Sequence, residues 1–309
     1  MEDNSASTRK GTRGLATHLS FEKRVRADRP MARVWRRFCR HKLGLISLGV
    51  LGLIVSFAVF AEVLASHDPY LINLQHTRQG PDRAHLLGTD LYGRDVLSRL
   101  IYGGRVSLTV GLVAVSIYEA IAIVLGSISG YRGGVVDIVI MRAVDMVLCF
   151  PWLIIILIFI AFFGPSIYNI MLGIGLLGWP GPTRLVRGQF LSLRESLYVT
   201  AARCVGVPDR GIMFRHILPG VVAPLIVHAT FGVALAILTE AALSFLGLGV
   251  RPPVASWGNM LTDAQSLTIL ARMPWLWLPP GLAIMVTVLA INFVGDALHD
   301  ALDPRALNK

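Results

Sequence analysis

The chain has 309 residues, of which 54% are hydrophobic and only 16% are charged, whereas soluble domains carry about 25% charged residues. These values exclude an ordinary soluble domain and favour membrane lipid as the surroundings. The formal net charge of +10 could indicate nucleic-acid binding. However, twelve of the 29 lysines and arginines precede Leu43, where the first long apolar run begins. This placement is typical of residues that flank a membrane span, so nucleic acid is not an expected partner.

Residues 1–32 are polar and basic and predict a disordered cytoplasmic tail. They lack the apolar run and cleavage site of a signal peptide. Residues 33–42 are again basic and contain Trp35. Because arginine and tryptophan are typical of membrane interfaces, we expect an interfacial helix here. This helix, the first transmembrane helix and an external loop are expected to make up residues 33–104.

Six apolar stretches are long enough for membrane helices, which need about 20 residues to cross the bilayer. They cover residues 43–65, 106–128, 135–163, 166–186, 221–246 and 273–294. The last five are expected to form a helical core within residues 105–305, followed by a C-terminal tail at 306–309. The sequence therefore predicts an all-α, polytopic membrane protein with six transmembrane helices.

The basic residues predict the orientation of these helices, because cytoplasmic loops are enriched in lysine and arginine. With the N-terminus in the cytoplasm, 22 of the 29 basic residues lie inside and seven lie outside. We therefore expect a multi-pass protein of the plasma (inner) membrane, with both termini and the polar segment at 184–216 on the cytoplasmic side.

Glycines four residues apart favour close packing of membrane helices. Gly126 and Gly130 have this spacing, and so do Gly130 and Gly134. The pattern is a weak signal, since glycine is common in membrane helices.

Charged residues inside the predicted spans are costly unless they are paired or hydrated. Arg142 and Asp145 are three residues apart and could form an ion pair near a helix end. Glu240 could line the path and meet a cationic group of a substrate, or it could make a structural hydrogen bond. Glu62 and Glu119 receive no role from the sequence.

The polar stretch before the second span contains a dense turn motif with Gly88, Asp90, Gly93, Arg94 and Asp95. Its glycines could act as hinges of a ligand-binding loop. Contact with an external binding protein and a purely structural turn are equally open interpretations. The two aspartates are too few to predict a calcium site.

The segment between the fourth and fifth spans has a periodic apolar face. Leu197, Ala201 and Val205 are spaced four residues apart, with Tyr198 and Ala202 beside them, which predicts a short amphipathic helix. Such a helix either packs beneath its own bundle or docks into a groove on a partner.

Local signals predict where this helix ends. Gly206 is a plausible C-terminal cap, and Pro208 suits the first turn of a second short helix. Pro219 is expected to end that second helix before the next span.

Ala201 and Ala202, Gly206 four residues later, and Leu218-Pro219 a dozen residues beyond resemble the cytoplasmic signature loop of binding-protein-dependent ABC importer permeases. In that family, the loop forms a coupling helix that sits in a cleft of the ATPase subunit. The resemblance implies this role for residues at about 197–217. The candidate coupling residues are Leu197, Tyr198, Thr200, Ala201, Ala202, Val205, Gly206, Leu218 and Pro219. Thr200 replaces the family's usual acidic residue, which removes a charge that an ion pair would need.

Other motifs resemble the dipeptide/oligopeptide group of these permeases, and within it the C-type subunit. They are Trp35-Arg-Arg-Phe with Lys42, the segment from His85 to Asp95, Leu243-Ser-Phe-Leu-Gly-Leu-Gly249, Pro252-Pro253 with Trp257-Gly258, and Asp300-Ala-Leu-Asp-Pro-Arg305. The likeness covers nearly the whole chain outside the tail.

The resemblance implies a type I importer-like permease fold. It also implies a translocation path shared with a homologous B-type permease, for peptides or similar small solutes that an external solute-binding protein delivers. Two separate ATPase subunits would use ATP and Mg, and this chain would hold no cofactor. The alternative function is an ion-driven secondary transporter, which would favour inverted repeats and acidic residues near mid-membrane.

Catalytic motifs are absent from the sequence. It contains no GxxxxGK[ST] phosphate loop, no GxSxG elbow and no zinc-protease spacing. Three separated cysteines (Cys39, Cys149 and Cys204) and eight scattered histidines give no disulfide or metal-binding pattern. We therefore expect no catalytic residues, no metal site and no enzymatic activity in this chain.

Overall fold

The computed structural model describes residues 30–302, which fold into helices and loops with no β-strand among them. The all-α prediction is thereby confirmed. The expected tail up to residue 29 and the end of the chain at 306–309 lie outside the described residues. The helices are α2 (Pro30–Phe38), α3 (Lys42–Val59), α4 (Ala61–Leu64), η1 (Leu74–His76), α5 (Val96–Arg132), α6 (Gly134–Leu148), α7 (Trp152–Phe163), α8 (Ile167–Leu177), α9 (Pro180–Leu193), α10 (Leu197–Cys204), α11 (Asp209–Gly211), η2 (Ile212–Ile217), α12 (Leu218–Phe245), α13 (Trp257–Met260), η3 (Leu261–Gln265), α14 (Leu267–Arg272) and α15 (Pro274–Leu302).

Four helices are long and apolar enough to cross a membrane: α3, α5, α15 and the continuous helix Asp209–Phe245, which includes α12. A fifth crossing results if α6 and α7, which meet at an angle of 83°, together form one span. The expected fourth span is divided between α8 and α9, which have 11 and 14 residues. The described residues form a polytopic helical protein, but the prediction of six continuous transmembrane helices is not matched.

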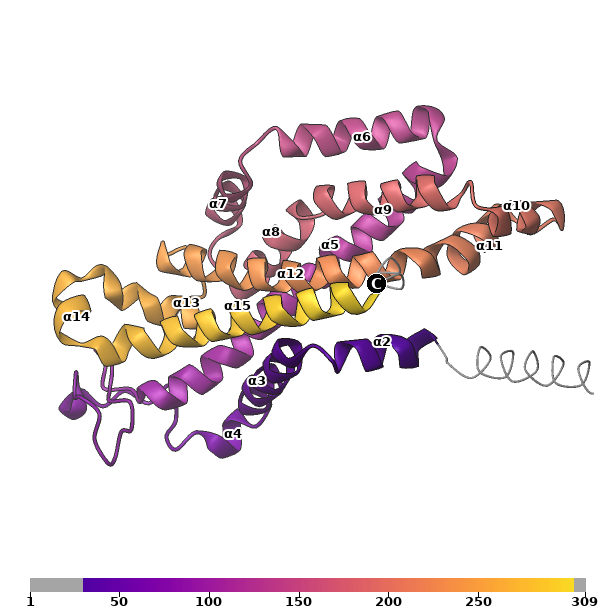
Figure 1. The fold of residues 1–309 in the computed structure, drawn as a ribbon. Helices are drawn as coiled ribbons and strands as arrows, with labels where there is room; N and C mark the ends of the chain where they lie inside the picture. The colour runs from indigo at the N-terminus through magenta and orange to yellow at the C-terminus, as the bar shows by residue number, and fades with distance from the viewer. Residues whose placement is uncertain (1–29, 303–309) are drawn as a thin grey trace, which may run out of the picture.

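The expected third span at 135–163 is wrong as a single helix, because the chain turns between α6 and α7. Pro151 stands directly before α7. Proline lacks a backbone N–H and disfavours the helical conformation of the preceding residue, here Phe150. In Figure 1, α6 lies at the edge of the molecule, outside the bundle of α5, α12 and α15.

The longest helix, α5, begins at Val96, well before the expected start of the second span at residue 106. The side chain of Asp95 accepts a hydrogen bond of 2.8 Å from the backbone N–H of Ser98. This N-cap satisfies a backbone donor that has no partner within the helix. The external loop is therefore shorter than predicted.

Arg105 lies inside α5 and ties this helix to α3. Its guanidinium contacts a carboxylate oxygen of Glu62 at 3.2 Å and donates to the carbonyls of Ala58 and Val59 at 3.0 and 2.9 Å. Glu62 thus belongs to a structural contact at the end of the first span.

Gly126 and Gly130 allow α5 and α9 to approach closely, as their spacing predicts. A methyl group on Gly126 would lie 2.7 Å from the Cβ of Val186, and one on Gly130 would lie 2.6 Å from the Cβ of Phe190. Larger residues at either position would push the helices apart. Gly134 has no heavy atom of another element within 4 Å of such a group, so the predicted contact at Gly134 is wrong.

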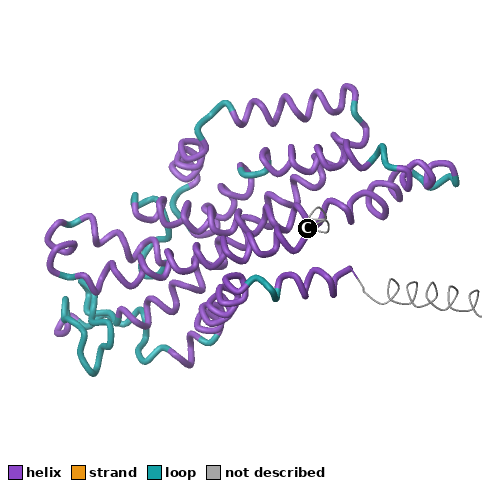
Figure 2. Tube along the Cα trace, viewed as in Figure 1, coloured by secondary structure: helices purple, strands orange, loops and turns teal. Residues whose placement is uncertain are grey.

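Two opposite ends of the bundle carry the irregular segments. Figure 2 shows the long loop at 66–95 at one end, and Figure 1 shows α10 and α11 projecting at the other end. The second end also holds α2 and the end of α15 (Figure 1). Phe38 of α2 packs there against Ala297 and Ala301 of α15.

Candidate functional site

The 197–217 segment, formed by α10, α11 and η2, presents an apolar surface away from the bundle. Leu197 and Val205 are 89% and 79% exposed, and Tyr198 is 46% exposed. Val199 and Ala202 are buried and anchor α10 to the bundle. The predicted face of this helix is therefore exposed rather than packed beneath its own bundle.

The anchoring side of α10 belongs to a buried apolar cluster that joins four elements. Val199 packs with Phe190 of α9, Ile212 and Ile217 of η2, and Val221 of α12. Ala202, which was expected on the apolar face, lies on this buried side instead. The cluster thus connects α10 to α9 and α12 through the side chains of η2.

Gly206 ends α10 as the sequence predicts. Its φ angle is +80°, a left-handed conformation that glycine adopts without steric cost. The backbone N–H of Gly206 donates to the carbonyl of Arg203 at 3.0 Å, and that of Val207 donates to the carbonyl of Ala202 at 3.1 Å. This pair of bonds is the Schellman arrangement that closes a helix C-terminus.

The two prolines that follow behave differently from one another. Pro208 directly precedes α11, close to its expected place in the first turn of a short helix. Pro219 does not end that helix, because α11, η2 and α12 continue as one helix. Pro219 lies in the first turn of α12, directly after the wider π-helical turn η2. That turn accommodates a ring that would clash inside a regular helix.

Contacts that no sequence pattern indicated hold the 197–217 segment to α5. The Tyr131 hydroxyl donates to Oδ1 of Asp209 at 2.6 Å, and the Arg203 guanidinium lies 5.7 Å from the centre of the Tyr131 ring. Thr200 donates its hydroxyl to the carbonyl of Ser196 at 3.3 Å within the helix. No local pattern signals a contact between residues 78 positions apart in the chain.

Ion pairs join α6 to α9. The Asp145 carboxylate lies 3.9 Å from the guanidinium nitrogen Nη1 of Arg142, as their spacing predicts. It lies closer, at 2.5 Å, to Nη2 of Arg184 on α9. Asp137 forms a two-pronged pair with Arg187 at 2.5 and 2.6 Å. The contacts of Arg184 and Arg187 are between helices, so these two residues hold α6 against α9.

Glu240 is fully buried within α12 and does not line a cavity wall open to a substrate. Its carboxylate accepts hydrogen bonds from the hydroxyls of Ser107, Ser244 and Ser256 at 3.0, 2.7 and 2.8 Å. Ser107 lies on α5, and Ser256 caps α13 by accepting from the backbone N–H of Asn259. The sequence left two interpretations of Glu240 open, a residue that lines the path and a structural hydrogen bond. The structure shows the structural hydrogen bonds.

The turn at 88–95 is organised by Asp90. Its carboxylate accepts from the backbone N–H groups of Tyr92 and Arg94 at 2.8 and 2.9 Å, and from the Arg94 side chain at 2.7 Å. Gly88 and Gly93 both have a φ of +73°. These features are those of a structural turn.

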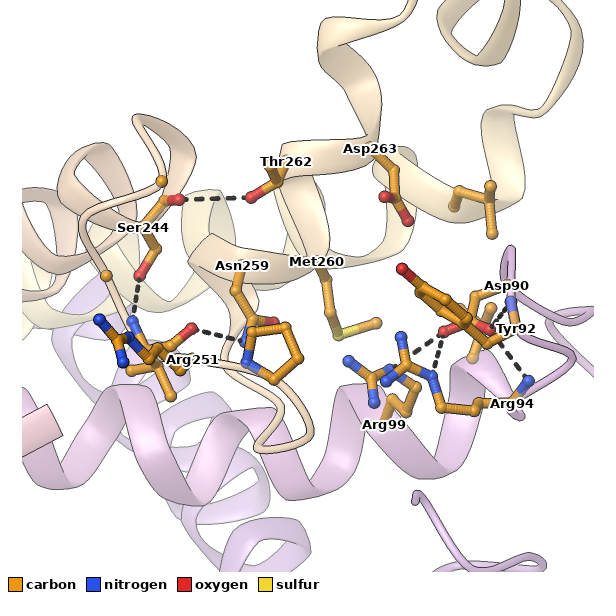
Figure 3. A pocket seen from close by; sticks show the side chains of 16 residues that line it. Asp90, Tyr92, Arg94, Arg99, Ser244, Arg251, Asn259, Met260, Thr262 and Asp263 are labelled. Atoms are coloured by element: carbon orange, nitrogen blue, oxygen red, sulfur yellow. Dashed lines mark hydrogen bonds and ion pairs between the residues drawn. The ribbon is translucent and has the colours of Figure 1, made fainter. Parts of the chain in front are cut away.

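A cavity of about 260 Å³ lies between this turn and the segment after α12. Figure 3 shows Asp90, Arg94 and Arg99 on one side and Asp263 facing them from the other. Burial, and secondarily the charge of Asp90, raises the pKa of Asp263. The cavity therefore holds opposite charges close together at the end of the bundle that carries the 66–95 loop.

Histidines that are scattered in sequence meet beside the same turn, which spacing did not indicate. Nδ1 of His85 lies 2.9 Å from Oδ1 of Asp95, and Nδ1 of His67 lies 4.0 Å from it. One ligand atom from each of these residues lies within 4.8 Å of the others. Because Asp95 also caps α5, this cluster fixes the loop to the start of that helix.

The helices and surfaces described above define a multi-pass helical protein of the permease class. Residues 122–308 match the family described as binding-protein-dependent transport system inner membrane component. Residues 29–81 match the N-terminal TM domain of oligopeptide transport permease C. The chain belongs to this family of inner membrane components and is a C-type permease subunit of an ABC importer.

Curated relatives cover almost the whole chain. The dipeptide transport system permease protein DppC of Alkalihalophilus pseudofirmus is 39% identical over 284 residues, which is 92% of this chain and 93% of the relative. The glutathione transport system permease protein GsiD of Pectobacterium atrosepticum is 38% identical over 89% of this chain and 91% of the relative. The oligopeptide transport system permease protein OppC of Haemophilus influenzae is 38% identical over 87% of each chain.

Proposed function

We propose that this subunit forms a translocation path for peptides together with a homologous B-type permease. Two separate ATPase subunits use ATP and Mg, and one of them binds the 197–217 segment, so this chain contributes movement and no catalytic group. An external solute-binding protein delivers the peptide to the end of the bundle that carries the 66–95 loop. No cofactor is required in this chain.

The observation that carries this proposal is the exposed apolar surface of α10. Leu197 and Val205 are almost fully exposed on a helix whose opposite side is firmly packed. An ordered apolar surface of this kind at the end of a membrane bundle favours a protein partner. Because α10 shares a buried cluster with α9 and α12, a partner that moves α10 would move these helices too.

The peptide cargo is supported by the relatives. They are named for the transport of dipeptides, oligopeptides and glutathione, which is itself a tripeptide. The shared chemistry of these compounds is a short chain with peptide groups and charged ends.

The orientation with both termini in the cytoplasm is supported by two independent features. Most basic residues fall on that side, in agreement with the preference of cytoplasmic loops for positive charge. In addition, α2, the end of α15 and the 197–217 segment lie at the same end of the bundle (Figure 1). An ion-driven secondary transporter has no comparable observation in its favour.

Copurification tests the docking of α10. Tagged protein with Leu197→Glu should lose the ATPase chains and the ATPase activity that accompany the wild-type protein in detergent, because a charge replaces a large apolar contact. Leu267→Glu is the matched control, since Leu267 is 81% exposed on α14. Retention of ATPase chains and full activity by Leu197→Glu would contradict the proposed docking surface.

A further inference from the structure

Two ionisable residues meet near the middle of the membrane helices, and none of the surfaces described above uses them. Nδ1 of His228 on α12 lies 2.7 Å from Oε1 of Glu119 on α5. Leu218, where α12 begins, and Arg132, where α5 ends, lie at the same end of the bundle. At a rise of ~1.5 Å per residue, His228 lies about 15 Å from Leu218 along α12, and Glu119 lies about 20 Å from Arg132 along α5. Half of a hydrocarbon core of ~30 Å is a similar distance, so the pair lies at mid-depth.

The pair fixes which atom of His228 remains free. Glu119 is 7% exposed, and its second oxygen, Oε2, is buried without a hydrogen-bond partner among the described residues. His228 is therefore the residue that holds this carboxylate in place. Because Nδ1 is engaged with Glu119, Nε2 is the ring nitrogen left to a ligand.

His228 lines a cavity of about 310 Å³ whose other walls are mostly apolar. Tyr118 of α5, Trp152 of α7 and Phe231 of α12 supply aromatic walls. Gly232 allows Tyr118 to approach α12 closely, because a side chain at this position would collide with the Tyr118 hydroxyl. The size and lining are those of a small-ligand site, with apolar walls and few polar groups.

We propose that this cavity, the His228 cavity, is a binding station on the translocation path. It holds an apolar side chain of the transported peptide, and Nε2 of His228 forms a hydrogen bond to the adjacent peptide group. Glu119 is a positioning residue that acts through His228. This inference rests on the proposed peptide transport function and adds to it a place of contact and a side-chain class.

The chemistry of the walls selects this occupant. Aromatic surfaces stabilise apolar groups by removing them from water, and the peptide group always carries an oxygen acceptor beside its side chain. The indole Nε1 of Trp152 is a second buried donor without a partner among the described residues. A small movement of α7 would therefore offer the same oxygen a second hydrogen bond.

Transport kinetics of the whole complex test the proposal. We reconstitute the two permeases, the ATPases and the binding protein in proteoliposomes and measure uptake of Leu-Leu and of Asp-Asp. His228→Gln should raise the KM for Leu-Leu about fivefold, the fold-change expected for one lost hydrogen bond of typical strength, while kcat changes little. Thr230→Ala is the matched control, since the Thr230 hydroxyl bonds within α12 to the carbonyl of Ile226.

The positioning role of Glu119 has its own readout. Glu119→Leu should raise the same KM, and the Glu119→Leu/His228→Gln double variant should be no worse than His228→Gln alone, because both changes remove one interaction. Additive losses, or losses in kcat alone, would assign Glu119 a merely structural role and overturn this part of the proposal.

Protection from labelling provides a test that does not depend on those variants. Leu235 also lines the cavity, so we introduce Leu235→Cys after replacing Cys39, Cys149 and Cys204 with serine. Saturating Leu-Leu should slow maleimide labelling of this position about tenfold in the transporting complex. Unchanged labelling, as expected if a lipid chain fills the cavity, would overturn the binding station.

These outcomes separate the inference from the proposed function. A wild-type complex that takes up no peptide would contradict the proposed function itself. A wild-type complex that transports Leu-Leu, together with an unchanged KM in His228→Gln, would contradict only the binding station.

Discussion

Buried polar residues illustrate how local context decides between structural and functional roles. Glu240 was open to both interpretations from the sequence, and three serine hydroxyls from α5, α12 and the α13 cap now account for its carboxylate. Glu119 has a single partner in His228 and an unpartnered oxygen. The number of hydrogen-bond partners, which sequence does not contain, distinguishes these two glutamates.

Glu240→Ala should destabilise the protein by about 2–4 kcal/mol, because it leaves three buried hydroxyls without their acceptor and opens a cavity. Glu240→Gln keeps the shape and an acceptor oxygen and should cost less. Thermal unfolding in detergent measures both changes. A stable Glu240→Ala variant with altered substrate preference would instead support a role in the path.

Asp263→Asn should raise stability at pH 7. The pKa of Asp263 is raised in the folded protein, so the folded state binds the proton of this carboxyl more tightly than the unfolded state does. The stability that this proton binding contributes is fully present below the ordinary pKa of an aspartate and is lost as the pH rises through the folded-state pKa. Asparagine removes the cost of the buried charge beside Asp90.

Unfolding temperatures between pH 4 and pH 8 test this prediction. The advantage of Asp263→Asn over the wild type should be largest at pH 7 and should shrink toward pH 4. A variant less stable than the wild type at pH 7 would show that the attraction of Arg94 and Arg99 for the Asp263 carboxylate outweighs its burial.

At the scale of elements, the end of a short helix could be predicted from the sequence, whereas the bounds of the long helices could not. The end of α10 followed from Gly206, because a helix cap depends on neighbouring residues alone. The start of α5 was missed because the N-cap role of Asp95 was overlooked within a polar motif. The bounds of the third span followed the apolar run, which continues across Pro151, whereas the chain turns there and divides the run into α6 and α7.

Gly206→Val should uncouple ATP hydrolysis from transport while leaving the protein inserted in the membrane. A β-branched residue at a φ of +80° costs roughly 1–2 kcal/mol, which frays the end of α10 and displaces its exposed face. The ratio of peptide taken up to ATP hydrolysed in proteoliposomes measures this effect.

Gly52→Val is a suitable control, since Gly52 lies in α3 with no heavy atom of another element within 4 Å of an added methyl group. It should transport at the wild-type ratio. Normal coupling by Gly206→Val would contradict the role assigned to this cap.

At the scale of the whole molecule, hydropathy and basic residues indicated a polytopic membrane protein, and the family followed from motifs spread along the chain. The candidate sites depended on contacts that only the fold provides. Glu119 and His228 are 109 residues apart, and Tyr131 and Asp209 are 78 residues apart. No single-sequence pattern brings such pairs together, so the short helix α10 was predictable and the mid-membrane cavity was not.

The architecture suggests how movement passes through the molecule. The exposed face of α10 lies at one end, and its buried face shares a cluster with α9 and α12. α12 also carries His228 and, nearer its far end, Glu240, which bonds to Ser256 at the cap of α13. A displacement of α10 would therefore reach both the His228 cavity and the opposite end of the bundle.

The measurement that tests the central claim most directly is peptide uptake into proteoliposomes that contain the complete complex and the binding protein. ATP should be required, and a non-hydrolysable ATP analogue should abolish uptake, because the proposed source of energy is ATP hydrolysis by the ATPase subunits. Collapse of ion gradients should leave the rate unchanged. Uptake that continues without ATP and follows an imposed ion gradient would contradict the account and favour a secondary transporter.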